Sequence, residues 1–226
     1  VDCVYIREFD ADFMHLSPEE FICGLIDKLN ITAVCVGYDY RFGYKAEGDV
    51  SVLKKLGEKH GFEVIVTDEM KTGGVTIKST KIRELVCEGK VDDASLFLGR
   101  PFSITGEVTK GLRNGHKLGT PTANVSYGDN KILPKEGVYM GYTTVCGVRY
   151  DSVINVGSNP TFDAKKITVE SHIIGFSGDI YGKTVKVDFV KRIRGDIKFD
   201  SLDGLKAQIK SDIQTAKEQL HRGEKK

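Results

Sequence analysis

The stretch GRPFSITGEVT (99–109) separates two parts of this 226-residue chain that have different secondary-structure patterns. After its first three residues, strand-like segments follow one another without long helices, and Gly and Asn cluster between several of them. The segments are residues 102–109, 138–145, 148–156, 168–176 and 184–194. Consecutive strands at this spacing predict an antiparallel barrel or sandwich. We therefore expect two domains, 1–98 and 99–226.

The part before residue 99 alternates between helix and strand patterns. One helix is predicted to start after Leu16, with Ser17 as N-cap, Pro18 at the first helical position and Glu20 completing a capping box. Asp49 is the expected cap of another helix. Strands are predicted at 1–6, 31–36 and 62–66, and short helices at 80–87 and 91–98. Strands separated by helices indicate a parallel sheet and hence an α/β fold.

The end of the chain returns to a helical pattern that begins near Ser201. Apolar residues recur on one stripe of this helix, at Leu202, Leu205, Ile209, Ile213, Ala216 and Leu220. Such a stripe is typical of a helix that packs on the body of its own domain.

The composition is that of an ordinary globular protein and excludes several classes. The 33 basic and 32 acidic side chains nearly cancel, so the charge predicts neither a nucleic-acid nor a membrane partner. The five cysteines are scattered and never form a CxxC pair, which argues against zinc and against a disulfide framework. We expect a reducing, cytoplasmic setting. The composition does not indicate an oligomeric state.

The strongest local signal is KGLRNGHKLGTPTAN (110–124), directly after a predicted strand. Glycines allow backbone N–H groups to approach an anion closely, and basic side chains neutralise its charge. From the glycines alone, a glycine-rich surface turn is the better explanation. The TPTAN that follows favours a phosphate site, because the short polar groups of Thr122 and Asn124 suit Mg²⁺ bound to phosphate.

A second signal is VESH (169–172), inside an otherwise apolar strand. Strand alternation places Glu170 and His172 on the same face. A carboxylate in a strand needs either a partner, for which Arg192 and Arg194 are candidates, or a chemical role. Near an ATP γ-phosphate, the carboxylate would accept the proton of an attacking alcohol.

Two weaker signals lie in the first part of the chain. Asp39 follows a predicted strand within a loop rich in Gly and aromatic residues, and loops of this kind bind ligands in α/β folds. An ordinary aromatic-lined turn is an equally good explanation. Ser79 and Thr80 stand at a predicted helix start beside basic side chains, which suits either a phosphate site or a plain N-cap.

Taken together, these motifs closely resemble the bacterial bifunctional riboflavin kinase/FMN adenylyltransferase family, also called FAD synthetase. The motifs that carry the resemblance are GYDYRFG (37–43), KSTKIR (78–83), LGRPFSITGEV (98–108), GHKLGTPTAN (115–124), GVY (137–139), NVGSNPTF (155–162), VESHIIGF (169–176), YGK (181–183) and KFDSLDGLKAQI (198–209). The resemblance implies a fold of class α/β plus β. A partial Rossmann-like nucleotidyltransferase domain would precede an antiparallel six-stranded riboflavin kinase β-barrel with a C-terminal helix.

For the barrel, the resemblance implies ATP- and Mg²⁺-dependent phosphorylation of riboflavin at its 5′-hydroxyl to give FMN. Glu170 would be the catalytic base. Thr122 would help to hold Mg²⁺, and Asn124 would contact the phosphate, the metal and the flavin side chain. The residues that would bind the ATP phosphates are Gly111, Arg113, Gly115, Lys117, Gly119 and Thr122.

For the first part of the chain, the resemblance implies an FMN adenylyltransferase module. Asp39 would match its flavin-side loop, and Ser79, Thr80 and Arg83 would match its phosphate-binding motif. The family's HxGH signature is expected before residue 1, and no His-x-Gly-His occurs in these 226 residues. We therefore expect that the chain as given does not make FAD.

A non-catalytic flavin- or nucleotide-binding barrel is the alternative, because small barrels often serve as binding modules. Glu170 distinguishes the two, since a pure binding module has no need of a carboxylate on its ligand-facing side.

Overall fold

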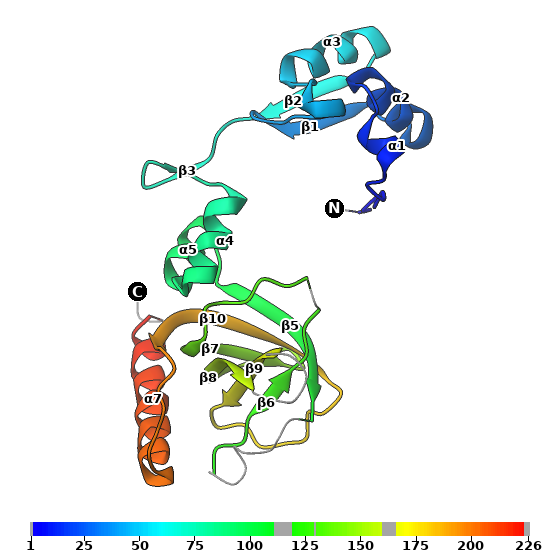
Figure 1. Ribbon diagram of the computed structural model, residues 1–226. Coiled ribbons are helices and arrows are strands. Elements are labelled where there is room, and N and C mark those ends of the chain that lie inside the picture. The colour runs from blue at the N-terminus through cyan, green and yellow to red at the C-terminus, as the bar shows by residue number, and fades with distance from the viewer. Residues whose placement is uncertain (1, 111–118, 129, 160–165, 224–226) are drawn as a thin grey trace. The chain divides into compact units, whose positions relative to one another are not determined.

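The computed structural model describes residues 2–110, 119–128, 130–159 and 166–223 of the chain (Figure 1). The chain divides into two compact units, Val1–Thr76 and Ile77–Lys226. The elements of the first unit are α1 (Ala11–Met14), α2 (Pro18–Leu29), β1 (Ala33–Gly37), η1 (Tyr44–Ala46), α3 (Val50–His60), β2 (Glu63–Thr67), β3 (Lys71–Thr72) and β4 (Val75–Thr76). Strands β1 and β2 pair in parallel, as the alternation of strands and helices predicted.

Local side-chain chemistry starts the two longer helices of this unit. The backbone N–H of Glu20 donates to Ser17 Oγ, and the backbone N–H of Ser17 donates to Glu20 Oε2, so the predicted capping box of α2 is confirmed. Asp49 caps α3 by accepting from the backbone of Ser51 and Val52. The Ser51 hydroxyl also donates to the Asp49 carboxylate. This bond first, and then the backbone bonds, hold the pKa of Asp49 below its ordinary value.

The prediction of a strand at residues 1–6 is wrong. Residues 2–10 have no regular secondary structure, and the side chains of Val4 and Ile6 are 74% and 87% exposed. An apolar run becomes a strand only where a neighbouring strand satisfies its backbone N–H and C=O groups. In the described part of the chain, the parallel sheet contains only β1 and β2.

The second unit contains a closed barrel. Its elements are α4 (Ser79–Glu88), α5 (Val91–Leu98), β5 (Phe102–Thr109), β6 (Ala123–Val125), β7 (Gly137–Val145), β8 (Val148–Asn159), β9 (Lys166–Ile173), β10 (Thr184–Arg194) and α7 (Leu202–Gly223). The strands close in the order β10-β5-β6-β9-β8-β7, and every neighbouring pair is antiparallel. The predicted six-stranded antiparallel barrel is confirmed, and the sandwich is wrong.

Two details of the barrel differ from the sequence-based expectation. Strand β6 was not predicted, because three residues are too few to show an alternating pattern. The strand predicted to reach residue 176 ends at Ile173, since the chain turns at Gly175, whose φ of 74° is left-handed.

The compact unit that contains the barrel begins at Ile77, before the boundary at residue 99 that the strand pattern suggested. Helices α4 and α5 lie against each other, and α5 packs against β5 and β10. The division into an adenylyltransferase domain, residues 1–98, and a kinase domain, residues 99–226, stays a prediction.

Alternation along the strands separates the inside of the barrel from its outer surface. Inward side chains form the core, among them Ile104, Tyr139, Ile154, Val169 and Phe189. Helix α7 lies along the outside of β7 and β8 (Figure 1). Its residues Ala216 and Leu220 pack there with Met140. The predicted apolar stripe thus packs on the barrel at these two positions, whereas Leu202 is exposed. Within the residues described, no helix is long and apolar enough to cross a membrane.

Candidate active site

The side chains of Thr122 and Glu170 meet on the outer surface of the barrel. Thr122 immediately precedes β6, and Glu170 lies within β9. These two strands pair with Asn124 opposite Glu170, which brings Thr122 beside the carboxylate although 48 positions separate the two residues. The Thr122 hydroxyl donates to Glu170 Oε2 over 3.2 Å. The TPTAN and VESH motifs therefore form one site.

Polar groups flank Glu170 on both neighbouring strands. Asn124 of β6 and Asn155 of β8 are its direct cross-strand partners, so all three side chains share a face. His172 lies on this face as predicted, and its ring Nδ1 donates to the carbonyl of Pro121 over 2.9 Å. The bond ties the backbone just before Thr122 to β9 and thereby fixes the hydroxyl next to the carboxylate.

The arginines considered as partners of Glu170 have other partners. Arg194 forms an ion pair with Asp212, and Arg192 donates to the backbone carbonyl of Glu136. No ion pair joins Glu170 to an arginine among the described side chains. Its carboxylate therefore accepts a hydrogen bond from a hydroxyl while remaining partly exposed.

Two cavities meet at Thr122. The first, which we call the helix-side cavity, has a volume of about 310 Å³ and lies between the outer face of the barrel and α7. Its lining consists of Thr120, Thr122, Val138, Val153, Asn155, Glu170, His172, Arg194, Asp196, Ile197, Phe199, Leu205, Ile209, Asp212 and Ile213. Seven of these fifteen side chains are apolar and eight are polar or charged, a combination of apolar surface and placed polar groups that suits a small-molecule site.

The second, which we call the loop-side cavity, has a volume of about 490 Å³. Its lining consists of Val108, Pro121, Thr122, Ala123, Ser171, Ile173, Phe176, Ser177, Gly178, Asp179, Ile180 and Tyr181. Thr122 is shared by both cavities, whereas, of these two cavities as the described residues line them, Glu170 belongs to the helix-side one. Two ligands could thus meet at Thr122, with the carboxylate on the side of only one of them.

The other residues predicted for the barrel site are partly covered by the structure. Gly111, Arg113, Gly115 and Lys117 lie outside the described residues. Gly119 is described, and its φ of 74° is a conformation that favours glycine.

The residues predicted for the adenylyltransferase module fall in both units. Asp39 lies in the exposed turn after β1, in the first unit. Ser79 and Thr80 open α4 in the second unit, where Arg83 donates to Thr80 Oγ1 over 3.3 Å. The N-cap of α4 is Lys78, which makes no side-chain capping bond. The plain N-cap role considered for the hydroxyls is therefore wrong.

No group of three or more His, Cys, Asp or Glu side chains that could hold a metal occurs in the described part of the chain. The groups that gather at Thr122, Asn124 and Glu170 are instead hydroxyl, amide and carboxylate oxygens. They suit a hard cation such as Mg²⁺, which completes its coordination with phosphate oxygens and water.

Two residues of the site, Asn155 and Asp212, were not predicted from the sequence. Asn155 stands next to Glu170, yet it was noted only as part of a motif. Asp212 lines the helix-side cavity from α7. The sequence does contain an indication that Asp212 is special. It is a charged residue three positions after Ile209 and four before Ala216, on a helix face predicted to be apolar.

Models of two protein families match the chain. The model described as riboflavin kinase matches residues 98–220, and the model described as FAD synthetase matches residues 1–81. A bifunctional riboflavin kinase/FMN adenylyltransferase from Listeria monocytogenes is 33% identical over 215 residues, which cover 95% of this chain and 68% of the relative. The protein of the same name from Escherichia coli K12 is 37% identical over 220 residues, covering 96% of this chain and 70% of the relative.

A solved structure from Streptococcus pneumoniae is also similar. It has a TM-score of 0.83 and 34% sequence identity, and the match covers 93% of this chain and 68% of that one. That structure is described as a macrolide-efflux protein.

Proposed function

The chain belongs to the bifunctional riboflavin kinase/FMN adenylyltransferase family, and from that premise we propose that Thr122 and Glu170 form the centre of its kinase site. The enzyme is a phosphotransferase that makes FMN from riboflavin and ATP. The observation that carries the proposal is the hydrogen bond from Thr122 to Glu170, at the point where two cavities meet.

The position of Glu170 indicates which substrate occupies each cavity. A general base must reach the hydroxyl group that it deprotonates. Because Glu170 lines the helix-side cavity and is not among the described residues that line the loop-side one, riboflavin occupies the helix-side cavity with its ribityl chain directed towards Glu170. Its flat aromatic ring system then lies between Phe199 and the aliphatic side chains of α7. The phosphates of ATP approach Thr122 from the loop-side cavity.

In the reaction, Glu170 accepts the proton of the riboflavin 5′-hydroxyl as the oxygen attacks the γ-phosphorus. The bond between that phosphorus and the β,γ-bridging oxygen breaks, and ADP leaves. Most of the rate acceleration comes from positioning and from neutralisation of charge. The hydrogen bond from Thr122 orients the carboxylate, and Asn124, opposite Glu170, contacts phosphate and the ribityl chain.

Magnesium belongs to this proposal, because oxygen atoms of Thr122 and Asn124 are of the type that this ion prefers. When bound, the ion would neutralise the charge of the phosphate oxygens. Gly111, Arg113, Gly115, Lys117 and Gly119 are proposed to surround the phosphates.

The first part of the chain is proposed to correspond to the FMN adenylyltransferase module, although without a His-x-Gly-His it is not expected to make FAD. Asp39 would act on the flavin side, and Ser79, Thr80 and Arg83 on the phosphate side. We also propose a cytoplasmic setting, which is supported by the five cysteines, all of which are described and free.

The function is tested by incubating the purified chain with riboflavin, ATP and Mg²⁺ and separating the flavins by chromatography. FMN is expected, and none without ATP or without Mg²⁺. Folded protein that binds riboflavin yet yields no FMN would point to a non-catalytic flavin-binding barrel. An FAD peak in the same run would contradict the expectation that a chain without His-x-Gly-His makes no FAD.

Replacement of Thr122 by alanine is expected to raise the Mg²⁺ concentration needed for half-maximal activity more than it raises the KM for riboflavin. The metal loses a ligand, whereas riboflavin keeps most of its contacts in the helix-side cavity. Titration of Mg²⁺ at saturating riboflavin, and the reverse titration, provide the measurement. Thr122→Ser is the matched control, since it retains the hydroxyl. Equal shifts in both requirements would show that Thr122 acts on the shape of the loop and does not bind the metal.

A further inference from the structure

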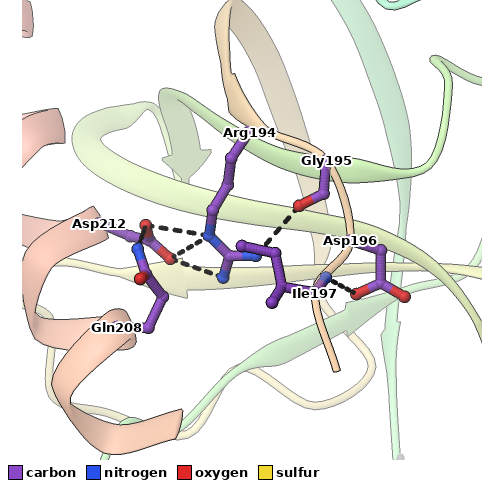
Figure 2. Close-up of polar contacts among 6 residues, drawn as sticks. All are labelled: Arg194, Gly195, Asp196, Ile197, Gln208 and Asp212. Atoms are coloured by element: carbon purple, nitrogen blue, oxygen red, sulfur yellow. Dashed lines mark hydrogen bonds and ion pairs between the residues drawn. The ribbon is translucent and has the colours of Figure 1, made fainter. Parts of the chain in front are cut away.

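A dense group of polar contacts joins the end of β10 to α7 (Figure 2). Arg194 Nε lies 3.2 and 3.1 Å from the two carboxylate oxygens of Asp212, and Arg194 Nη2 donates to Asp212 Oδ2 over 2.8 Å. Gln208, one turn earlier on α7, donates to Asp212 Oδ1 over 2.9 Å. Arg194 Nη1 donates to the carbonyl of Gly195 over 3.1 Å. The carboxylate thus receives a forked contact from the arginine and a further bond from the amide.

This ion pair is largely removed from water. The exposed fraction of the side chain is 16% for Arg194 and 3% for Asp212. Burial of two charges costs desolvation energy, and well-packed apolar side chains of similar volume are often as stable or more stable. Stability alone therefore does not explain a buried pair at this position.

The location of the pair suggests another role. In the cross-strand register, Arg194 is opposite Val138, Val138 is opposite Asn155, and Asn155 is opposite Glu170. The arginine thus stands in the same row of outward-facing side chains as the proposed base. Both Arg194 and Asp212 line the helix-side cavity.

The side chain of Arg194 connects three walls of that cavity. Its stem belongs to the barrel face, its fork holds Asp212 of α7, and its Nη1 holds the chain at Gly195. It also lies 5.9 Å from the ring centroid of Phe199, another lining residue. The distance between α7 and the row that contains Glu170 is therefore fixed by directional bonds.

We propose that Arg194 and Asp212 are positioning residues for the flavin: they set the width of the helix-side cavity so that α7 and Phe199 enclose the flat ring while the ribityl chain reaches Glu170. The inference rests on the assignment of this cavity to riboflavin. ATP binding does not depend on the pair, because no residue of the pair lines the loop-side cavity.

The test uses the double variant Arg194→Met/Asp212→Leu in the full chain. Apolar side chains of similar volume keep α7 on the barrel but remove the directional bonds, so thermal unfolding should occur at or above the wild-type temperature. The Kd of riboflavin, measured by quenching of its fluorescence, is expected to rise at least ~10-fold. The Kd of ATP is expected to stay at the wild-type value.

A matched control breaks a different contact between α7 and the barrel. His221 Nε2 lies 3.2 Å from Asp151 Oδ2, and neither residue lines a cavity described above. Asp151→Ala is expected to leave the Kd of riboflavin unchanged. Should the double variant fail to fold, Arg194→Lys replaces it, because lysine keeps the charge but loses the fork. This variant should also weaken riboflavin binding without affecting ATP.

Wild-type riboflavin affinity in a folded double variant, or in Arg194→Lys, would overturn the inference. Equal weakening of riboflavin and ATP would also overturn it, since a general disturbance of the barrel affects both ligands. Because these are binding constants, the result does not depend on turnover. A wild-type chain that binds riboflavin but forms no FMN would instead count against the kinase site.

Discussion

Replacement of Glu170 by glutamine is expected to slow FMN formation at least ~10²-fold, the lower range for loss of a general base. The glutamine side chain has nearly the same shape, and its amide oxygen can still accept the hydrogen bond from Thr122. It cannot take up the proton of the riboflavin 5′-hydroxyl. The change therefore removes the chemistry and leaves the geometry of the site largely intact.

The rate is measured as FMN formed at saturating riboflavin, ATP and Mg²⁺, and riboflavin binding is measured separately by fluorescence. Binding of both substrates should persist in the variant. Glu107→Gln on β5 is the matched control, since this glutamate is exposed on another strand and lines neither cavity. Unchanged turnover in Glu170→Gln would remove Glu170 from its proposed role.

Replacement of Gly106 by alanine is expected to lower the free energy of unfolding of the barrel by about 3 kcal/mol or more, at the upper end of the cost of overpacking. A Cβ atom on Gly106 would lie 1.6 Å from the backbone oxygen of Ser126. That oxygen belongs to the chain just after β6, whose Ser126 N–H donates to the Glu107 carbonyl. Backbone cannot swing aside like a side chain, so β5 and β6 would have to separate.

Urea unfolding of the chain, followed by far-UV circular dichroism, provides the measurement. Gly128→Ala is the control, because no atom lies within 4 Å of a Cβ built there. Its unfolding free energy should stay within ~0.5 kcal/mol of the wild type, as for most surface substitutions. A fully stable Gly106→Ala barrel would show that β5 and β6 are not held as closely as described.

Much of the fold follows from local patterns. The bounds of β5 and β10 agree with the predicted strands, and the capping box of Ser17 and Glu20 opens α2 as expected. Alternation and capping are properties of neighbouring residues, so they can be recognised without knowledge of the fold. The predicted strand at residues 1–6 was wrong because a strand depends on a partner that its own residues do not specify.

The sequence by itself determined the barrel, its C-terminal helix, the shared face of Glu170 and His172, and the motifs that place the chain in its family. Only the tertiary structure decided which side chains meet. Local patterns left Glu170 with two possible arginine partners, and the closed barrel gave it Thr122 as a neighbour. The docking of α7 on the barrel placed Asp212 beside Arg194, so the two form an ion pair. Pairings of this kind depend on strand order and on where a helix docks, and no short stretch of sequence contains that information.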